Sequence, residues 1–112
     1  TTGNTLSLHD ALPISLGAAD YIAIARRFHT LFLEDVPVIA ADARDTAMRF
    51  ITLVDVLYEN RVRLVVTAEA EPEGLVAAAD GKEAFAAART ASRLHEMRSE
   101  SWLASAEELP LT

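Results

Sequence analysis

Two arginines near the carboxyl end are the clearest candidates for chemistry in this sequence. Arg89 and Arg93 lie four residues apart in the segment RTASRL. At this spacing, both side chains of a helix project from one side. Two guanidinium groups facing a cleft can clamp phosphate through bidentate hydrogen bonds. The simpler interpretation is that Glu96 and Glu100 pair with them at the surface, where an ion pair contributes about 0–1 kcal/mol.

A second candidate is the acidic end of an apolar run. Residues 32–35 read Phe-Leu-Glu-Asp, so Glu34 and Asp35 follow a segment that reads as a buried strand. P-loop enzymes hold Mg²⁺ with an acid in such a place. Here the order is Glu-Asp and no phosphate-binding loop precedes it, which favours a solvated strand end.

No further catalytic or metal site is indicated. The chain has no cysteine, which excludes disulfides and thiolate ligands. His29 and His95 are far apart in the sequence and accompany no convergent carboxylate pair. Ser92 precedes His95 by three residues, a spacing that is frequent by chance on helices. We therefore predict no catalytic residue and no metal site within this chain.

Two amphipathic helices are expected in the first half of the chain. One follows Gly17, with Asp20 as a cap or first-turn acid. The other covers residues 43–59, where apolar residues recur at steps of three and four. Asp42 is its expected cap and Asn60 its expected end.

Apolar runs rich in β-branched or bulky residues predict two strands, at 30–33 and 62–67. A polar loop follows the second run. A third helix is expected to begin at Glu83, with Trp102 fixing its end, and the tail 106–112 is expected to fray.

The resulting order, α-β-α-β-α, predicts an α/β fragment with two parallel strands. We expect residues 31–33 and 64–66 to be neighbouring or near-neighbouring parallel strands, with the helix 43–59 packed across them. Two strands do not complete a sheet, so they should belong to a larger one.

Composition narrows the classes of protein further. The chain has 112 residues, a net charge of -7 and 51% hydrophobic residues, which suits one small domain. The acidic balance argues against a nucleic-acid-binding surface. No apolar run approaches the roughly 20 residues that span a bilayer, and the amino terminus does not read as a signal peptide. A cytoplasmic protein without a transmembrane segment is expected.

The first residues have a separate explanation. Thr5 to Ile14 read TLSLHDALPI, which is the translation of a common sequencing adapter. Such segments are set aside before fold reasoning. Residues 1–15 are therefore expected to be a non-native tail that makes no packed contacts, leaving 16–105 as the natural α/β segment of a truncated chain.

Three separated segments resemble one family, in order along the chain. They are DYIAIARRFHTLFLEDVPVI, RFITLVDVLYENRVRLVVTAEAEPEGL and FAAARTASRLHEMRSESWL. Together they are similar to the carboxy-terminal region of the ZapE-type cell-division ATPases and their mitochondrial relatives. The resemblance covers about residues 16–103, nearly all of the expected natural segment.

The resemblance implies an amino-terminal P-loop ATPase module of the AAA+ type, which would use ATP and Mg²⁺. This chain contains no G-x-x-x-x-G-K-[ST] motif, and none of its four glycines is placed to wrap a phosphate. We therefore expect the fragment itself to bind no nucleotide. The resemblance further suggests Arg93 and Arg89 as nucleotide-sensing residues, able to reach a neighbouring subunit. It also suggests Thr67 as a polar sensor, although polarity resumes at any strand end.

Two functions remain open from the sequence. The first is a segment of an ATP-hydrolysing cell-division protein that contacts division proteins and associates with itself. The second is a non-catalytic protein-interaction module, which would bind a partner through the helix 43–59 and the acidic loop 69–73.

Overall fold

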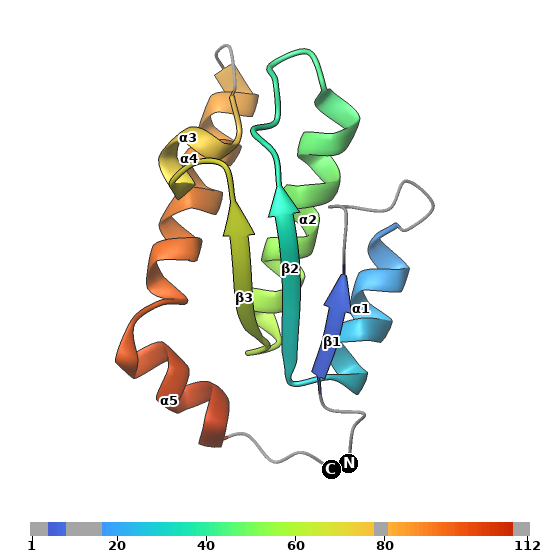
Figure 1. Cartoon of the computed structure of the whole chain (residues 1–112), viewed down its shortest axis with the longest axis vertical. Helices are drawn as coiled ribbons and strands as arrows, with labels where there is room; N and C mark the ends of the chain where they lie inside the picture. Colours follow the sequence, from blue (N-terminus) through green and yellow to red (C-terminus); the bar gives the residue numbers. More distant parts are fainter. Residues whose placement is uncertain (1–4, 9–16, 78–80, 109–112) are drawn as a thin grey trace.

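Three parallel strands with helices packed against them form the fold (Figure 1). The computed structural model describes residues 5–8, 17–77 and 81–108. Its elements, in chain order, are β1 Thr5–Leu8, α1 Ala18–Arg27, β2 Thr30–Val36, α2 Arg44–Glu59, β3 Arg63–Ala68, α3 Pro72–Leu75, α4 Gly81–Glu96 and α5 Glu100–Glu108.

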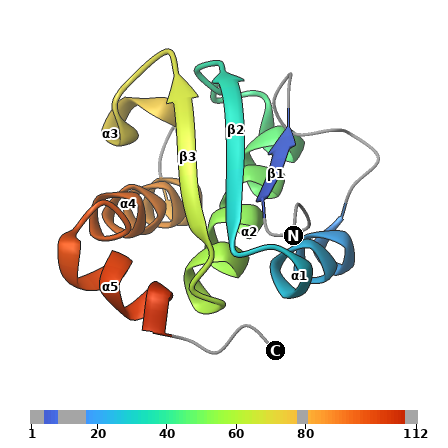
Figure 2. The ribbon, with the colours of Figure 1, turned by 60° about the horizontal axis from the view of Figure 1, so that its bottom comes forward.

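The predicted parallel pair is confirmed. Strands β2 and β3 are adjacent and parallel, with Leu31 opposite Leu64 and Leu33 opposite Val66. Helix α2 joins them and lies between α1 and α4 against the sheet (Figure 2). The chain is thus an α/β fragment, as the alternation of helical and strand patterns predicts.

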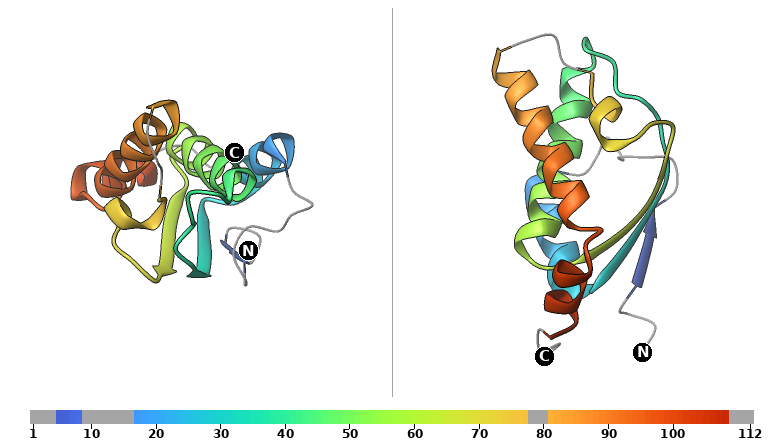
Figure 3. Two further views of the ribbon diagram at one scale, coloured as in Figure 1. Left: turned by 90° about the horizontal axis from the view of Figure 1, so that it is seen from above. Right: turned by 90° about the vertical axis from the view of Figure 1, so that its left-hand side faces the viewer.

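The helices cover one face of the sheet (Figure 3). Leu31 and Leu33 of β2 and Phe50 and Leu57 of α2 are fully buried between the two layers. Burial of such side chains supplies most of the free energy of folding. The opposite face carries exposed apolar surface, including Val65, which is 45% exposed. Parallel sheets normally have both faces covered, so this exposed face has the character of one that packs against further protein.

A third strand, β1, extends the sheet beyond the two that were predicted. Thr5–Leu8 pairs in parallel with Thr30–Leu33. The expectation that nothing before Leu16 packs against the rest is therefore wrong for this segment. The open edge of β2 offers unpaired backbone groups, and an extended segment within reach can pair with them whatever its origin. Residues 9–16, including Leu12, lie outside the described residues.

Strand β2 continues past its predicted end at Leu33. The register with β3 shifts between Leu33 and Val36, which marks a β-bulge, and Val36 is again fully buried. Within the bulge, Asp35 has φ 61°, a left-handed conformation that Asp tolerates better than most residues. The sequence pattern missed this because polarity at Glu34 resembles the end of a strand.

The helix boundaries differ in three places. Ala43, not Asp42, is the N-cap residue of α2, and no side chain caps this helix. Asn60 ends α2 as predicted. The loop after β3 contains the short helix α3, and α4 begins at Gly81 rather than at Glu83.

Trp102 lies on a helix of its own rather than at the end of α4. The Ser99 hydroxyl accepts a hydrogen bond from the Trp102 backbone N–H at 3.2 Å, which caps α5. This cap separates α5 from α4. Helix α5 reaches Glu108 and so includes the first residues of the tail that is expected to fray, while 109–112 lie outside the described part.

Candidate functional site

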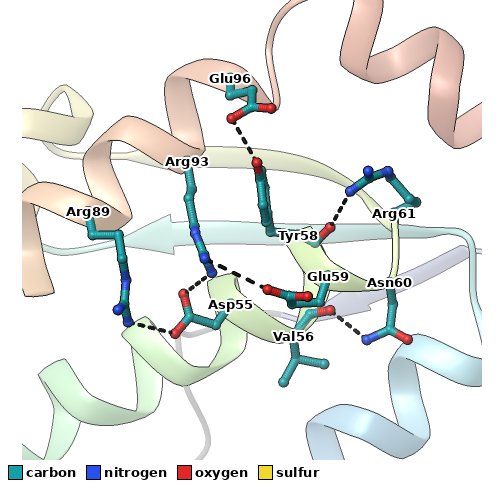
Figure 4. Close-up of polar contacts among 9 residues, drawn as sticks. All are labelled: Asp55, Val56, Tyr58, Glu59, Asn60, Arg61, Arg89, Arg93 and Glu96. Carbon is teal, nitrogen blue, oxygen red and sulfur yellow. Dashed lines mark hydrogen bonds and ion pairs between the residues drawn. The ribbon is translucent and has the colours of Figure 1, made fainter.

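Arg89 and Arg93 converge on one carboxylate of the neighbouring helix (Figure 4). Arg93 Nη1 lies 2.7 Å from Asp55 Oδ1, and Arg89 Nη2 lies 3.1 Å from Asp55 Oδ2. Both arginines thus project from one side of α4, as their spacing predicts, and that side faces α2. Each oxygen of Asp55 accepts from a different arginine, so the three side chains form a single charged cluster between α2 and α4.

Arg93 is enclosed more tightly than Arg89. Its guanidinium carbon lies 4.6 Å above the centre of the Tyr58 ring, a cation–π contact. A second carboxylate, that of Glu59, lies 3.7 Å from Arg93 Nη2. The side chain of Arg93 is 22% exposed, compared with 48% for Arg89. These contacts fix the orientation of the Arg93 guanidinium.

Tyr58 is itself held in place by α4 and α5. Its hydroxyl donates to Glu96 Oε1 at 2.8 Å, and its ring stacks on Trp102 with centroids 6.3 Å apart. The hydrogen bond to Glu96 raises the pKa of Tyr58 above its ordinary value, with burial adding to the effect. Glu96 therefore pairs with Tyr58 rather than with an arginine. The surface ion pairs considered for Glu96 and Glu100 are not the ones observed, since Arg93 pairs with Asp55 and Glu59 instead.

Asp55 is the residue that sequence reasoning missed. It stands inside the apolar run LVDVL of α2, next to the fully buried Val54. A carboxylate in such a place is costly unless a cation compensates it. That rule could have predicted a basic partner on another element, although not which one.

Thr67 lies elsewhere, near the carboxyl end of β3. Its hydroxyl accepts a hydrogen bond from the Asp35 backbone N–H at 2.8 Å, which holds the bulge of β2 in place. Thr67 also lines a groove of about 550 Å³ that runs to Arg98 on the turn after α4. Thr67 therefore contacts the Glu34-Asp35 segment of β2, and its hydrogen bond to Asp35 is a structural one.

The cluster lies between α2 and α4, whereas Thr67 lies near the carboxyl end of β3. Arg93 contacts Glu59, the last residue of α2, which leads directly into the start of β3. Thr67 lies four residues beyond Arg63, the first residue of β3, which is roughly 13 Å along the strand at about 3.3 Å per residue. Arg93 therefore does not lie at the carboxyl edge of the sheet, where ligands gather in open α/β folds.

The acidic loop weighed as a partner-binding surface is engaged within the chain. Glu69 Oε1 accepts a hydrogen bond from the Val38 backbone N–H at 3.0 Å, and Glu71 lies 3.9 Å from Arg98. Glu73 contacts the ring of His95. Its backbone N–H and then His95 hold the pKa of Glu73 below its usual value. The apolar face of α2 is likewise covered by the chain's own core.

Over the described ranges, no three His, Asp or Glu side chains come together as a metal site would require. Within the same ranges, no helix combines the length and apolar character needed to cross a membrane.

Comparison with known proteins gives a consistent set of relatives. A model of the AFG1-like ATPase family matches residues 3–106. The cell division protein ZapE of Escherichia coli (strain K12) is 48% identical over 84 residues, which cover 75% of this chain and 22% of ZapE. An uncharacterised protein of Schizosaccharomyces pombe is 32% identical over 114 residues, covering 79% of this chain and 25% of that protein.

A zebrafish (Danio rerio) relative, lactation elevated protein 1 homolog B, is 43% identical over 61 residues, covering 54% of this chain and 12% of that protein. This chain therefore spans a quarter or less of the length of these curated relatives. No solved structure matches it.

Proposed function

Because this chain belongs to the AFG1-like ATPase family, we propose that it is the carboxy-terminal α/β part of an ATP-binding and ATP-hydrolysing cell-division protein. The family match over residues 3–106, together with the identity to ZapE, carries this proposal. ATP and Mg²⁺ would be held by a P-loop module outside this chain. The protein would act in the cytoplasm, alongside cell-division proteins, and would associate with itself.

The arginine cluster has a distinct role in this proposal. Arg93 and Arg89 lie away from the carboxyl edge of their own sheet, and Arg89 is half exposed at the seam between α2 and α4. An arginine so placed would stabilise the charge on a phosphate brought by a neighbouring subunit. Self-association of the full-length protein would then be a condition for fast ATP hydrolysis.

Residues 1–15 remain proposed as adapter-derived, on the strength of the ten-residue identity to the adapter's translation. The natural family segment would then begin near Leu16 and extend to about 105. Pairing of Thr5–Leu8 with β2, and a family match that begins at residue 3, count against this proposal.

The isolated chain is expected to show no ATP turnover above background and no saturable ATP binding. The reason is that its four glycines include no phosphate-wrapping loop. Isothermal titration with Mg·ATP and a phosphate-release assay on the purified chain check this. The matched comparison is the full-length protein carrying this segment, which should bind and hydrolyse ATP. Saturable ATP binding by the isolated chain, or none by the full-length protein, would contradict the proposal.

A further inference from the structure

We propose that Asp55 is a built-in competitor for an oxyanion. In this state Asp55 occupies the arginine pair, and a ligand of the phosphate class binds Arg89 and Arg93 once the carboxylate is displaced. The inference rests on the proposed function in that it concerns the same two arginines. It adds the regulation of the site by a residue of α2.

The two arginines hold the Asp55 carboxylate in the way that they would hold a phosphate. One planar carboxylate is held by two guanidinium groups, with Arg93 at 2.7 Å on one oxygen and Arg89 at 3.1 Å on the other. Phosphate oxygens are recognised by the same donors in the same convergent arrangement. Asp55 therefore stands where a bound oxyanion would stand (Figure 4).

The net charge of the cluster depends on Asp55. Asp55 and Glu59 together offset the two positive charges of the arginines. An anion that arrives from solvent then meets a cluster without net positive charge. Neutralising Asp55 leaves an excess positive charge between α2 and α4, which attracts an anion.

The arginine pair is both accessible to solvent and held in orientation. Arg89 is 48% exposed and Asp55 is 27% exposed, so solvent anions reach the cluster. The Tyr58 ring, 4.6 Å below Arg93, keeps that guanidinium oriented even without Asp55. Only the carboxylate has to give way.

Replacing Asp55 with Asn tests the inference, since it keeps the shape and removes the charge. The probe is pyrophosphate, titrated into the 112-residue chain at constant ionic strength. Trp102 is the only tryptophan and stacks on Tyr58, so its fluorescence reports on the cluster. Asp55→Asn is expected to lower the Kd for pyrophosphate by about tenfold or more relative to the unchanged chain, equivalent to about 1.4 kcal/mol.

Asp45→Asn is the matched control, because it removes one negative charge from the first turn of the same helix. It should leave the Kd within about twofold of the starting value. Adding Arg93→Ala to Asp55→Asn should abolish the gain. Equal affinities for Asp55→Asn and Asp45→Asn would overturn the proposal. Weaker binding by Asp55→Asn would overturn it too, and would make Asp55 a positioning residue instead.

Circular dichroism establishes that each variant is folded. If Asp55→Asn does not fold, Glu59→Gln is the deciding variant. The Glu59 side chain is 66% exposed, so removing its charge perturbs the packing little. A gain of about twofold or more in pyrophosphate affinity is then expected, and an unchanged Kd overturns the proposal. Neither result depends on ATP turnover by the full-length protein, so failure here leaves the proposed function standing.

Discussion

In the full-length protein, Arg93→Ala is expected to lower kcat for ATP hydrolysis by about 10³-fold. An arginine that stabilises the charge of phosphoryl transfer contributes on that scale, whereas an exposed ion pair contributes about 0–1 kcal/mol to stability. Arg93→Lys should lose much of the same rate, because lysine keeps the charge but not the planar fork of donors. Steady-state phosphate release measures both variants.

The ion pair with Asp55 makes a stability control necessary. Arg93→Ala leaves Asp55 with one cation instead of two, and Asp55→Asn breaks the same contact from the other side. The change in the Tm of the full-length protein should therefore be similar for the two variants. A catalytic role predicts that kcat falls far more for Arg93→Ala than for Asp55→Asn. Unchanged turnover, or an equal loss in both variants, would leave Arg93 as a structural ion-pair partner.

Phe50→Ala is expected to lower the free energy of unfolding by about 3–5 kcal/mol. Phe50 is fully buried in α2 between the sheet and the neighbouring helices, and truncating a buried Phe removes apolar contacts and leaves a cavity. Domains of this size have about 5–15 kcal/mol in total, so the variant should lose a large share of its stability. Urea denaturation followed by circular dichroism measures the loss.

Met48→Ala is the matched control on the same helix, because its side chain is 56% exposed. Its effect should stay within about 0.5 kcal/mol. Similar losses for Phe50→Ala and Met48→Ala would contradict the placement of α2 in the core, and with it the position of Asp55 beside the arginines.

The arrangement of α2 between two parallel strands follows from patterns that depend on local residues. Leu31, Leu33 and Phe50 sit where period-two and helical spacing place them, and burial then decides the packing. The bulge at Asp35 could not be predicted in this way. It depends on a hydrogen bond to Thr67, 32 residues further along the chain.

Only part of the candidate site could be predicted from the sequence. The spacing of Arg89 and Arg93 correctly predicted a shared side of one helix, since that is a property of helix geometry. Their partner was missed, because Asp55 meets them only after α2 and α4 have packed together. Tertiary packing also decides which end of the sheet an arginine reaches, and no local pattern carries that information.

Our central proposal is that this chain is the carboxy-terminal part of a P-loop ATPase. Long-read sequencing of the source DNA across the codon for Leu16 tests it most directly. We predict an open reading frame that continues upstream of Leu16 without the adapter-like codons and encodes a G-x-x-x-x-G-K-[ST] motif a couple of hundred residues earlier. An upstream frame that lacks this motif, or that closes with a stop codon just before Leu16, would contradict it.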